Sequence, residues 1–172
     1  MAAEQILQRE QRLPGSPDEV FAFFADAYNL ETLTPPLLRF RVVTPTPITM
    51  GKGALIRYRL RVHGVPVSWL TEIKEWEPPH RFVDEQLTGP YALWHHTHTF
   101  EPTGDGDTLM RDVVRYRIGF GPLGALANRF VVRRDVEAIF DFRAQRIPAL
   151  LAAARDGSDG PLRPVRRPVR RR

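Results

Sequence analysis

The sequence contains no cysteine among its 172 residues. Disulfide bonds, thiolate metal ligands and cysteine nucleophiles are therefore excluded, so the stability of the fold must come from packing. The sequence also lacks any apolar run near the roughly 20 residues that a membrane-spanning helix needs, and residues 1–9 lack the apolar stretch of a signal peptide. No internal repeat and no glycine-rich phosphate loop is present. These absences lead us to expect a soluble, cytoplasmic protein.

Positive charge is unevenly distributed along the chain. Residues 156–172 hold six arginines and two aspartates, which supply +4 of the formal net charge of +5. The rest of this segment is mainly Gly, Ser and Pro, which cannot bury enough apolar surface to order it. We therefore expect one domain at residues 1–155 and a disordered Arg/Pro-rich tail at residues 156–172. The positive charge of the tail predicts a weak electrostatic contact with nucleic acid or anionic membrane. The alternative is that the tail is a solubilising extension without a partner.

The N-terminal segment predicts a strand followed by two helices. Residues 5–13 alternate in part and end at a Pro-Gly turn, which favours a strand. Ser16 is a good N-cap and Pro17 suits the first helical position, and apolar residues follow at helical spacing. A second, short helix is expected at residues 29–33, where two prolines stop it.

The middle of the chain alternates with a period of two, which is typical of half-buried strands. In residues 56–62 every odd position is arginine and every even position is apolar or aromatic, so one face is buried. Further strands are expected from residue 65 to the prolines at 78 and 79, and over residues 81–87, 92–101 and 109–118. A long helix is then expected from about residue 125, with a kink or an end near Arg146 caused by Pro148. This order indicates an α+β fold.

Several phrases, taken in this order, resemble the START-like helix-grip superfamily (SRPBCC), which includes polyketide cyclases and lipid-binding proteins. The phrases are Ser-Pro-Asp-Glu-Val-Phe at 16–21, Trp69 with Glu72-Ile73, Pro78-Pro79, Arg-Phe-Val-Asp at 81–84, Gly-Pro-Tyr at 89–91, Trp-His-His-Thr-His-Thr-Phe at 94–100 and Ile-Phe-Asp-Phe-Arg at 139–143. The resemblance spans residues 5 to about 151 and points to a bacterial ligand-binding branch. It implies a curved antiparallel sheet wrapped around the C-terminal helix, two short helices after the first strand, and a ligand cavity between sheet and helix.

With the arginine-free face turned inward, the strands predict the wall of this cavity. The expected wall comprises Ile56, Tyr58, Leu60, Trp69, Thr71, Ile73, Phe82, Asp84, Gln86, Trp94, His96, His98, Phe100, Asp112, Val114 and Tyr116. The expected ligand-binding residues are Tyr58, Leu60, Trp69, Thr71, Phe82, Gln86, Trp94, His96, His98, Phe100, Val114, Tyr116, Phe140 and Arg143. For Arg143 the helix pattern favours the wet face, and the alternative, in which it binds ligand, is that it turns inward to meet an acidic group of the ligand. Such a wall suits a hydrophobic or amphipathic ligand such as a lipid, a quinone or a polyketide. The alternative is that these side chains fill the core completely.

Four polar side chains on the inward face are the candidate catalytic residues: His96, His98, Asp84 and Asp112. Hairpins without bulges would place Asp84 opposite His96, and His98 opposite Asp112. Such pairs favour the charged histidine and could act as a general acid or base in aldol or dehydration chemistry. The alternative is a pair of structural contacts that satisfy a polar interior.

No metal site and no cofactor are expected. His96 and His98 share a face with Asp84 or Asp112, but two histidines two positions apart are a weak metal signal. Residues 120–124 form an apolar, glycine-rich loop before the long helix, which predicts either a mobile lid or an ordinary helix-entry loop.

Three functions from different classes follow. We favour a carrier or sensor that binds a hydrophobic small molecule without changing it. One alternative is an enzyme of the cyclase, aromatase or dehydratase type that uses the His/Asp pairs. The other is an interaction module whose basic tail contacts nucleic acid or membrane. We expect a monomer or a homodimer.

Overall fold

The structure is a computed structural model that describes residues 3–119 and 131–155. Seven antiparallel strands form one sheet in the order β1-β7-β6-β5-β4-β3-β2. The strands are β1 (Gln5–Leu13), β2 (Arg41–Val42), β3 (Leu55–Val62), β4 (Val65–Glu77), β5 (Arg81–Thr88), β6 (Leu93–Pro102) and β7 (Thr108–Arg117). The helices are α1 (Pro17–Ala25), α2 (Asn29–Thr32), the 3-10 helix η1 (Pro36–Leu38) and α4 (Arg133–Arg155).

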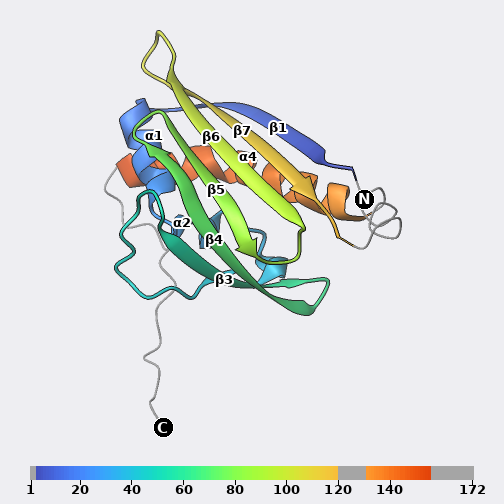
Figure 1. Cartoon of the computed structure of the whole chain (residues 1–172). Helices are drawn as coiled ribbons and strands as arrows, with labels where there is room; N and C mark the ends of the chain where they lie inside the picture. Colours follow the sequence, from blue (N-terminus) through green and yellow to red (C-terminus); the bar gives the residue numbers. More distant parts are fainter. Residues whose placement is uncertain (1–2, 120–130, 156–172) are drawn as a thin grey trace.

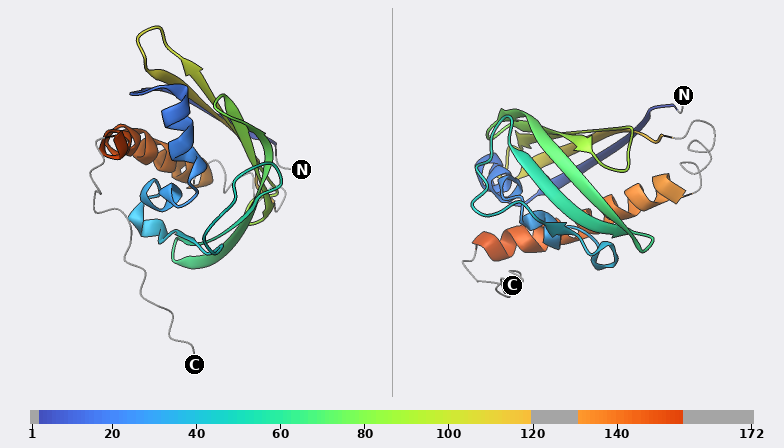
Figure 2. Two further views of the ribbon diagram at one scale, coloured as in Figure 1. Left: turned by 90° about the vertical axis from the view of Figure 1, so that its left-hand side faces the viewer. Right: turned by 60° about the horizontal axis from the view of Figure 1, so that its bottom comes forward.

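The sheet is curved, and α1, α2 and α4 all lie on its concave side (Figures 1 and 2). The long helix α4 runs across the strands, so the sheet wraps around it as the helix-grip prediction required. The predicted α+β fold is therefore confirmed. None of the described helices is long and apolar enough to cross a membrane. The predicted tail at 156–172 and the predicted lid at 120–124 lie outside the described residues.

The arginine alternation separates the two faces of the sheet as predicted. Ile56, Tyr58 and Leu60 of β3 are buried, whereas the arginines at 57, 59 and 61 are exposed. The turn into β4 has positive φ angles at His63 (49°) and Gly64 (82°), which a tight hairpin turn with the right twist requires. The pairings of β5 with β6 and of β6 with β7 run without a register shift, so their inward side chains stay in phase.

The N-terminal elements follow the capping signals in the sequence. Ser16 and Glu19 form a capping box, in which Oγ of Ser16 accepts from N–H of Glu19 and N–H of Ser16 donates to the Glu19 carboxylate at 2.8 Å. The structure adds η1 and β2, which the sequence did not predict. Two or three residues are too few to show a period, and β2 is ordered by its pairing with Tyr58 and Arg59 of β3.

Pro148 does not end α4, since the helix continues to Arg155; of the two predicted outcomes, a kink or an end near Arg146, the end is wrong. A proline leaves the carbonyl four residues earlier, here that of Ala144, without its helical donor. Gln11 of the edge strand β1 supplies the replacement, because its Nε2 donates to O of Ala144 at 2.7 Å. A hydrogen bond between β1 and α4 therefore replaces the one that the proline removes from within the helix.

Two apolar clusters fasten the helices to the sheet. The first joins α1 and the C-terminal half of α4 to the strands through Leu13, Val20, Phe21, Phe82, Phe100, Ile147 and Leu150. The second joins the N-terminal half of α4 to the other end of the sheet through Leu7, Trp94, Val114, Tyr116, Val136 and Phe140. Ile56 and Tyr58 of β3 and Ile73 of β4 form a third cluster with Ala27 and Val42, and beside them the interior stays open.

Candidate functional site

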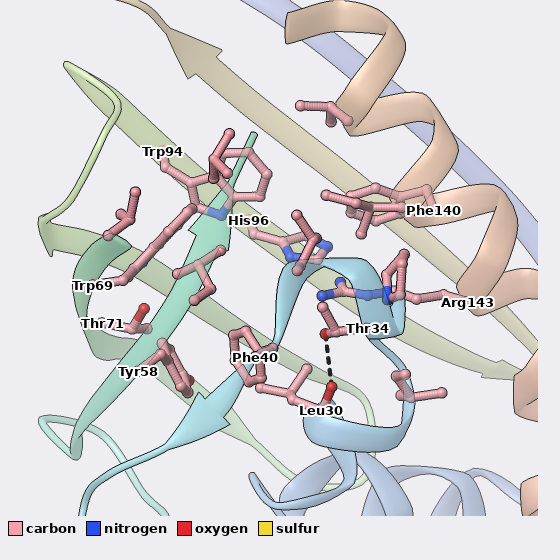
Figure 3. Close-up of a pocket in the computed structure, with 18 of the residues that line it drawn as sticks. Leu30, Thr34, Phe40, Tyr58, Trp69, Thr71, Trp94, His96, Phe140 and Arg143 are labelled. Atoms are coloured by element: carbon pink, nitrogen blue, oxygen red, sulfur yellow. Dashed lines mark hydrogen bonds between the residues drawn. The ribbon is translucent and has the colours of Figure 1, made fainter. Parts of the chain in front are cut away.

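A cavity of about 800 Å³ lies between the sheet and α4. Its walls come from the inward faces of β3 to β7, from α4, and from the segment between α1 and β2 (Figure 3). Two of its large apolar lining residues are strongly exposed, Leu37 of η1 (87%) and Val65 at the start of β4 (63%). The cavity therefore opens between η1 and the β3–β4 turn.

Most of the predicted wall lies where the alternation placed it. The predicted ligand-binding residues that line the cavity are Tyr58, Leu60, Trp69, Thr71, Phe82, Trp94, His96, His98, Phe140 and Arg143. Ile56, Ile73, Asp84 and Asp112 line it as well. The aromatic members pack against one another, with Trp69 and Trp94 edge to face at 5.2 Å between ring centroids.

Four predicted wall residues do not reach the cavity. The Gln86 amide turns to the backbone of Tyr91, where Nε2 donates to the carbonyl at 2.7 Å and so holds the β5–β6 turn. Phe100 is 1% exposed and packs among Phe21 and its neighbours in the first apolar cluster. Val114 and Tyr116 face inward, but the N-terminal half of α4 covers them. The alternation placed these residues on the inward face, but they do not line the cavity; their role in ligand binding stays a prediction.

One wall of the cavity was not predicted from the sequence. Leu30, Thr34 and Phe40 lie across from the sheet, and Oγ1 of Thr34 donates to O of Leu30 at 2.7 Å (Figure 3). This segment mixes two short helices with prolines, so it has no hydrophobic period. The signal that could have found it is composition, because the stretch is rich in Leu and aromatic residues although it has no regular structure.

Two histidines and two aspartates form a closed cluster at the cavity wall. The predicted registers are correct, with Asp84 opposite His96 and His98 opposite Asp112. Each carboxylate also reaches the diagonal histidine. Oδ2 of Asp84 lies 3.1 Å from Nε2 of His98 and 3.5 Å from Nδ1 of His96, and Oδ1 of Asp112 lies 3.0 Å from Nε2 of His96 and 2.8 Å from Nδ1 of His98. The two imidazole rings lie 3.7 Å apart between these carboxylates.

All four members of this His–Asp cluster line the cavity, and the carboxylates are the more exposed of them. The side chains of His96 and His98 are 4% and 8% exposed, whereas those of Asp84 and Asp112 are 19% and 15% exposed. Every imidazole nitrogen already lies within 3.5 Å of a carboxylate oxygen. A bound molecule would therefore meet carboxylate oxygens before it meets the rings.

The two histidines differ in protonation. Burial by itself lowers the pKa of His98, but hydrogen bonding and charge from Asp112 and Asp84 outweigh it and raise the pKa. For His96, burial and the charge of His98 prevail, so its pKa is lowered. Burial by itself raises the pKa values of Asp84 and Asp112, but hydrogen bonds and charges from the histidines lower both. The cluster therefore favours ionised carboxylates, and His98 holds a proton more readily than His96 does.

The donor atoms of Asp84, His96 and His98 all lie within 4.8 Å of one another, so this group could hold a metal ion. Imidazole and carboxylate are suitable ligands for zinc and similar metals. The same atoms are already engaged in the His–Asp contacts described above. Nε2 of each histidine hydrogen-bonds to an aspartate, whereas Nδ1 of His98 is buried without a hydrogen-bond partner among the described residues, although Oδ1 of Asp112 lies 2.8 Å away.

Comparison with known proteins agrees with this architecture. The model of the polyketide cyclase / dehydrase and lipid transport family matches residues 4–152. No curated protein sequence matches the chain significantly. Among solved structures, the ZhuI aromatase/cyclase from Streptomyces sp. R1128 is 14% identical with a TM-score of 0.73, covering 92% of this chain and 99% of its own.

Two further structures share the fold. TTHA0849 from Thermus thermophilus is 21% identical with a TM-score of 0.65, covering 85% of this chain and 99% of its own. A START superfamily protein from Mycobacterium smegmatis is 11% identical with a TM-score of 0.61, covering 84% of this chain and 98% of its own. These likenesses confirm the predicted helix-grip fold. Since the family model matches nearly the whole described domain, the chain belongs to the polyketide cyclase / dehydrase and lipid transport family.

Proposed function

We propose that this protein binds a hydrophobic or amphipathic small molecule in the cavity between sheet and α4, as a carrier or sensor. The observation that carries the proposal is the cavity itself. A space of about 800 Å³, lined mainly by apolar and aromatic side chains with a few polar groups, has the size and character of a ligand site. A domain whose inward side chains merely filled a core would not leave such a space.

A cavity-blocking variant tests this proposal. Val67 points inward from β4 and lines the cavity, while the next residue, Ser68, is exposed on the opposite face. Val67→Trp is expected to weaken binding at least about tenfold, because a bulky side chain occupies the space of the ligand. Ser68→Trp adds the same side chain outside and is expected to leave binding unchanged.

Native mass spectrometry of the purified protein, followed by thermal-shift screening of fatty acids, quinones and aromatic polyketides, supplies the ligand for this comparison. Bound molecules that co-purify with wild type and Ser68→Trp, and are missing from Val67→Trp, support a cavity site. Equal retention by all three proteins would locate binding elsewhere and contradict the proposal.

A second candidate is an enzyme of the cyclase or dehydratase type, favoured by the His–Asp cluster at the wall. Loss of water requires one group to remove a proton from carbon and another to protonate the departing hydroxyl. In this proposal Asp84 and Asp112 contact the substrate. One carboxylate accepts the proton from carbon and passes it to His96, and the other passes a proton from His98 to the departing hydroxyl, which leaves as water. The presence of an aromatase/cyclase among the structural relatives supports this candidate.

The enzyme proposal has its own test. Asp84→Asn and His98→Ala are each expected to lower turnover of a bound polyketide by about 10²–10⁴-fold, the usual contribution of a general acid or base, with ligand affinity changed only slightly. Product formation and the dissociation constant are measured on the same variants. Equal losses in turnover and affinity would show that the cluster only shapes the site.

A further inference from the structure

Arg143 projects its charge into the cavity without a partner from the described chain. The guanidinium extends from α4 into the cavity toward His96 and Thr34 (Figure 3). Within residues 3–119 and 131–155 it makes no hydrogen bond or ion pair, and its Nε is sealed from solvent without an acceptor. It does contact the ring of Phe140, with the guanidinium carbon 5.1 Å from the ring centroid.

Three surface arginines contrast with Arg143, which has no ion pair within the described residues. Arg9, Arg111 and Arg115 each pair with a carboxylate, although water could solvate them. Arg143 lies in the protein interior, where an unpaired charge lowers the stability of the fold more than it does at the surface. Asp84 and Asp112 act on it electrostatically, but their close contacts go to the two histidines. Because the described chain provides no acceptor, one supplied by a ligand would complete the site.

The place of Arg143 along α4 indicates how a ligand would lie. Asp135, in the first turn of α4, pairs with His63 of the β3–β4 turn at 2.7 Å, and both residues line the rim of the cavity. Arg143 lies two turns further, about 12 Å along the helix axis. Trp69 and Trp94 form the facing wall (Figure 3). A ligand that reaches Arg143 would therefore cover its remaining length with apolar contacts.

We propose that Arg143 is the anion-binding end of the cavity, and that the ligand is an apolar monocarboxylic acid whose carboxylate pairs with the guanidinium through two parallel hydrogen bonds. This inference rests on the proposed function and names the ligand class. The planar guanidinium fork matches the two oxygens of a carboxylate, whereas a lysine would offer only a point charge. The apolar body is aliphatic or aromatic, as the wall allows.

The charges that face Arg143 predict that the acid enters together with a proton. They belong to Asp84 on β5, His96 and His98 on β6, and Asp112 on β7, while Tyr58 on β3 stays neutral because burial raises its pKa. With His98 charged and His96 neutral, these groups and Arg143 sum to zero. A bound carboxylate would add one negative charge, which His96 cancels by taking up a proton. Affinity for the acid therefore falls as pH rises, and affinity for a neutral analogue does not.

Matched acid and alcohol probes test the proposal on the full chain. The pairs are decanoate with 1-decanol and 2-naphthoate with 2-naphthalenemethanol, followed by tryptophan fluorescence and calorimetry. Wild type is expected to bind the better-fitting acid about 10–100-fold more tightly than its alcohol. Arg143→Gln is expected to remove this preference by weakening only the acid. Arg146→Gln, an exposed arginine almost one turn later that does not line the cavity, is the control and keeps the preference.

Two further readouts separate ligand recognition from a structural role. Calorimetry in buffers of different ionisation enthalpy is expected to show uptake of about one proton with the acid and none with the alcohol. Arg143→Met, which removes the unpaired charge, is expected to raise the melting temperature of the ligand-free protein by about 2–4 °C. A lower melting temperature would assign Arg143 a structural role and overturn the inference.

The outcomes distinguish this inference from the function on which it rests. Equal binding of acids and alcohols by wild type, or equal losses of both in Arg143→Gln, overturns the carboxylate site and leaves the proposed cavity function intact. Failure of all four probes to bind, with no co-purifying ligand, counts against both.

Discussion

Asp112→Leu is expected to lower the free energy of unfolding by about 3–5 kcal/mol, because it removes one of the two carboxylates that stabilise the charge buried on the histidines. Asp112 contacts both histidines of the cluster, at 3.0 Å and 2.8 Å. Those histidines are at most 8% exposed, so water cannot replace the carboxylate. Urea unfolding at neutral pH, followed by circular dichroism, measures the loss.

Two comparisons isolate the cause. Asp141→Leu also removes an ion-paired aspartate, but that side chain is 62% exposed and its pairing with Arg9 is screened by water, so only a small fraction of the Asp112 loss is expected. Replacing all four cluster residues with leucine or phenylalanine, together with Arg143→Met, is expected to restore wild-type stability or exceed it, since the buried charges of the cluster and of Arg143 are then all removed. A loss for Asp112→Leu no larger than that for Asp141→Leu would refute this account.

If the apolar replacement is at least as stable, packing does not require the His–Asp cluster. A buried polar cluster that faces a cavity and contributes little net stability is expected where a protein keeps it for function. Arg143 has the same character, since it adds an unpaired charge to the opposite wall. The cavity therefore concentrates the features that a purely structural core would avoid.

The pairing in the cluster could be predicted because short turns set the registers on both sides of β6. With Asp84 opposite His96 and Asp112 opposite His98, a strict period of two brings all four side chains to one face. The sequence could not predict that each carboxylate would bridge both rings. That contact depends on side-chain rotation toward a diagonal neighbour, which register alone does not determine.

The limits of the cavity were harder to predict than its inward face. A period of two shows which side chains point inward, but not where a helix will cover them. Val114 and Tyr116 follow the same inward pattern as His96, yet α4 packs onto them and removes them from the cavity wall. Leu30 and Phe40 line the cavity from an irregular segment, where no period exists to be recognised.

Phe100 provides the clearest test of this distinction between core and wall. Its ring lies 5.5 Å, 5.6 Å and 6.0 Å from those of Phe21, Phe24 and Phe82, and it is 1% exposed. Phe100→Ala is expected to lower the free energy of unfolding by about 3–5 kcal/mol, because the surrounding rings cannot close the new void. Denaturant unfolding measures this change.

Leu60→Ala and Thr99→Ala complete the comparison. Leu60 faces the existing cavity, so its truncation enlarges a space that is already open and is expected to cost less than that of Phe100, while changing ligand affinity. Thr99 precedes Phe100 on the opposite face of β6 and controls for strand position; its truncation is expected to change stability little. If Phe100→Ala instead weakened binding as much as Leu60→Ala did, at a similar small cost in stability, Phe100 would belong to the ligand wall that the alternation predicted. A large loss of stability with unchanged affinity would show that Phe100 belongs to the packed core and not to the ligand-binding wall.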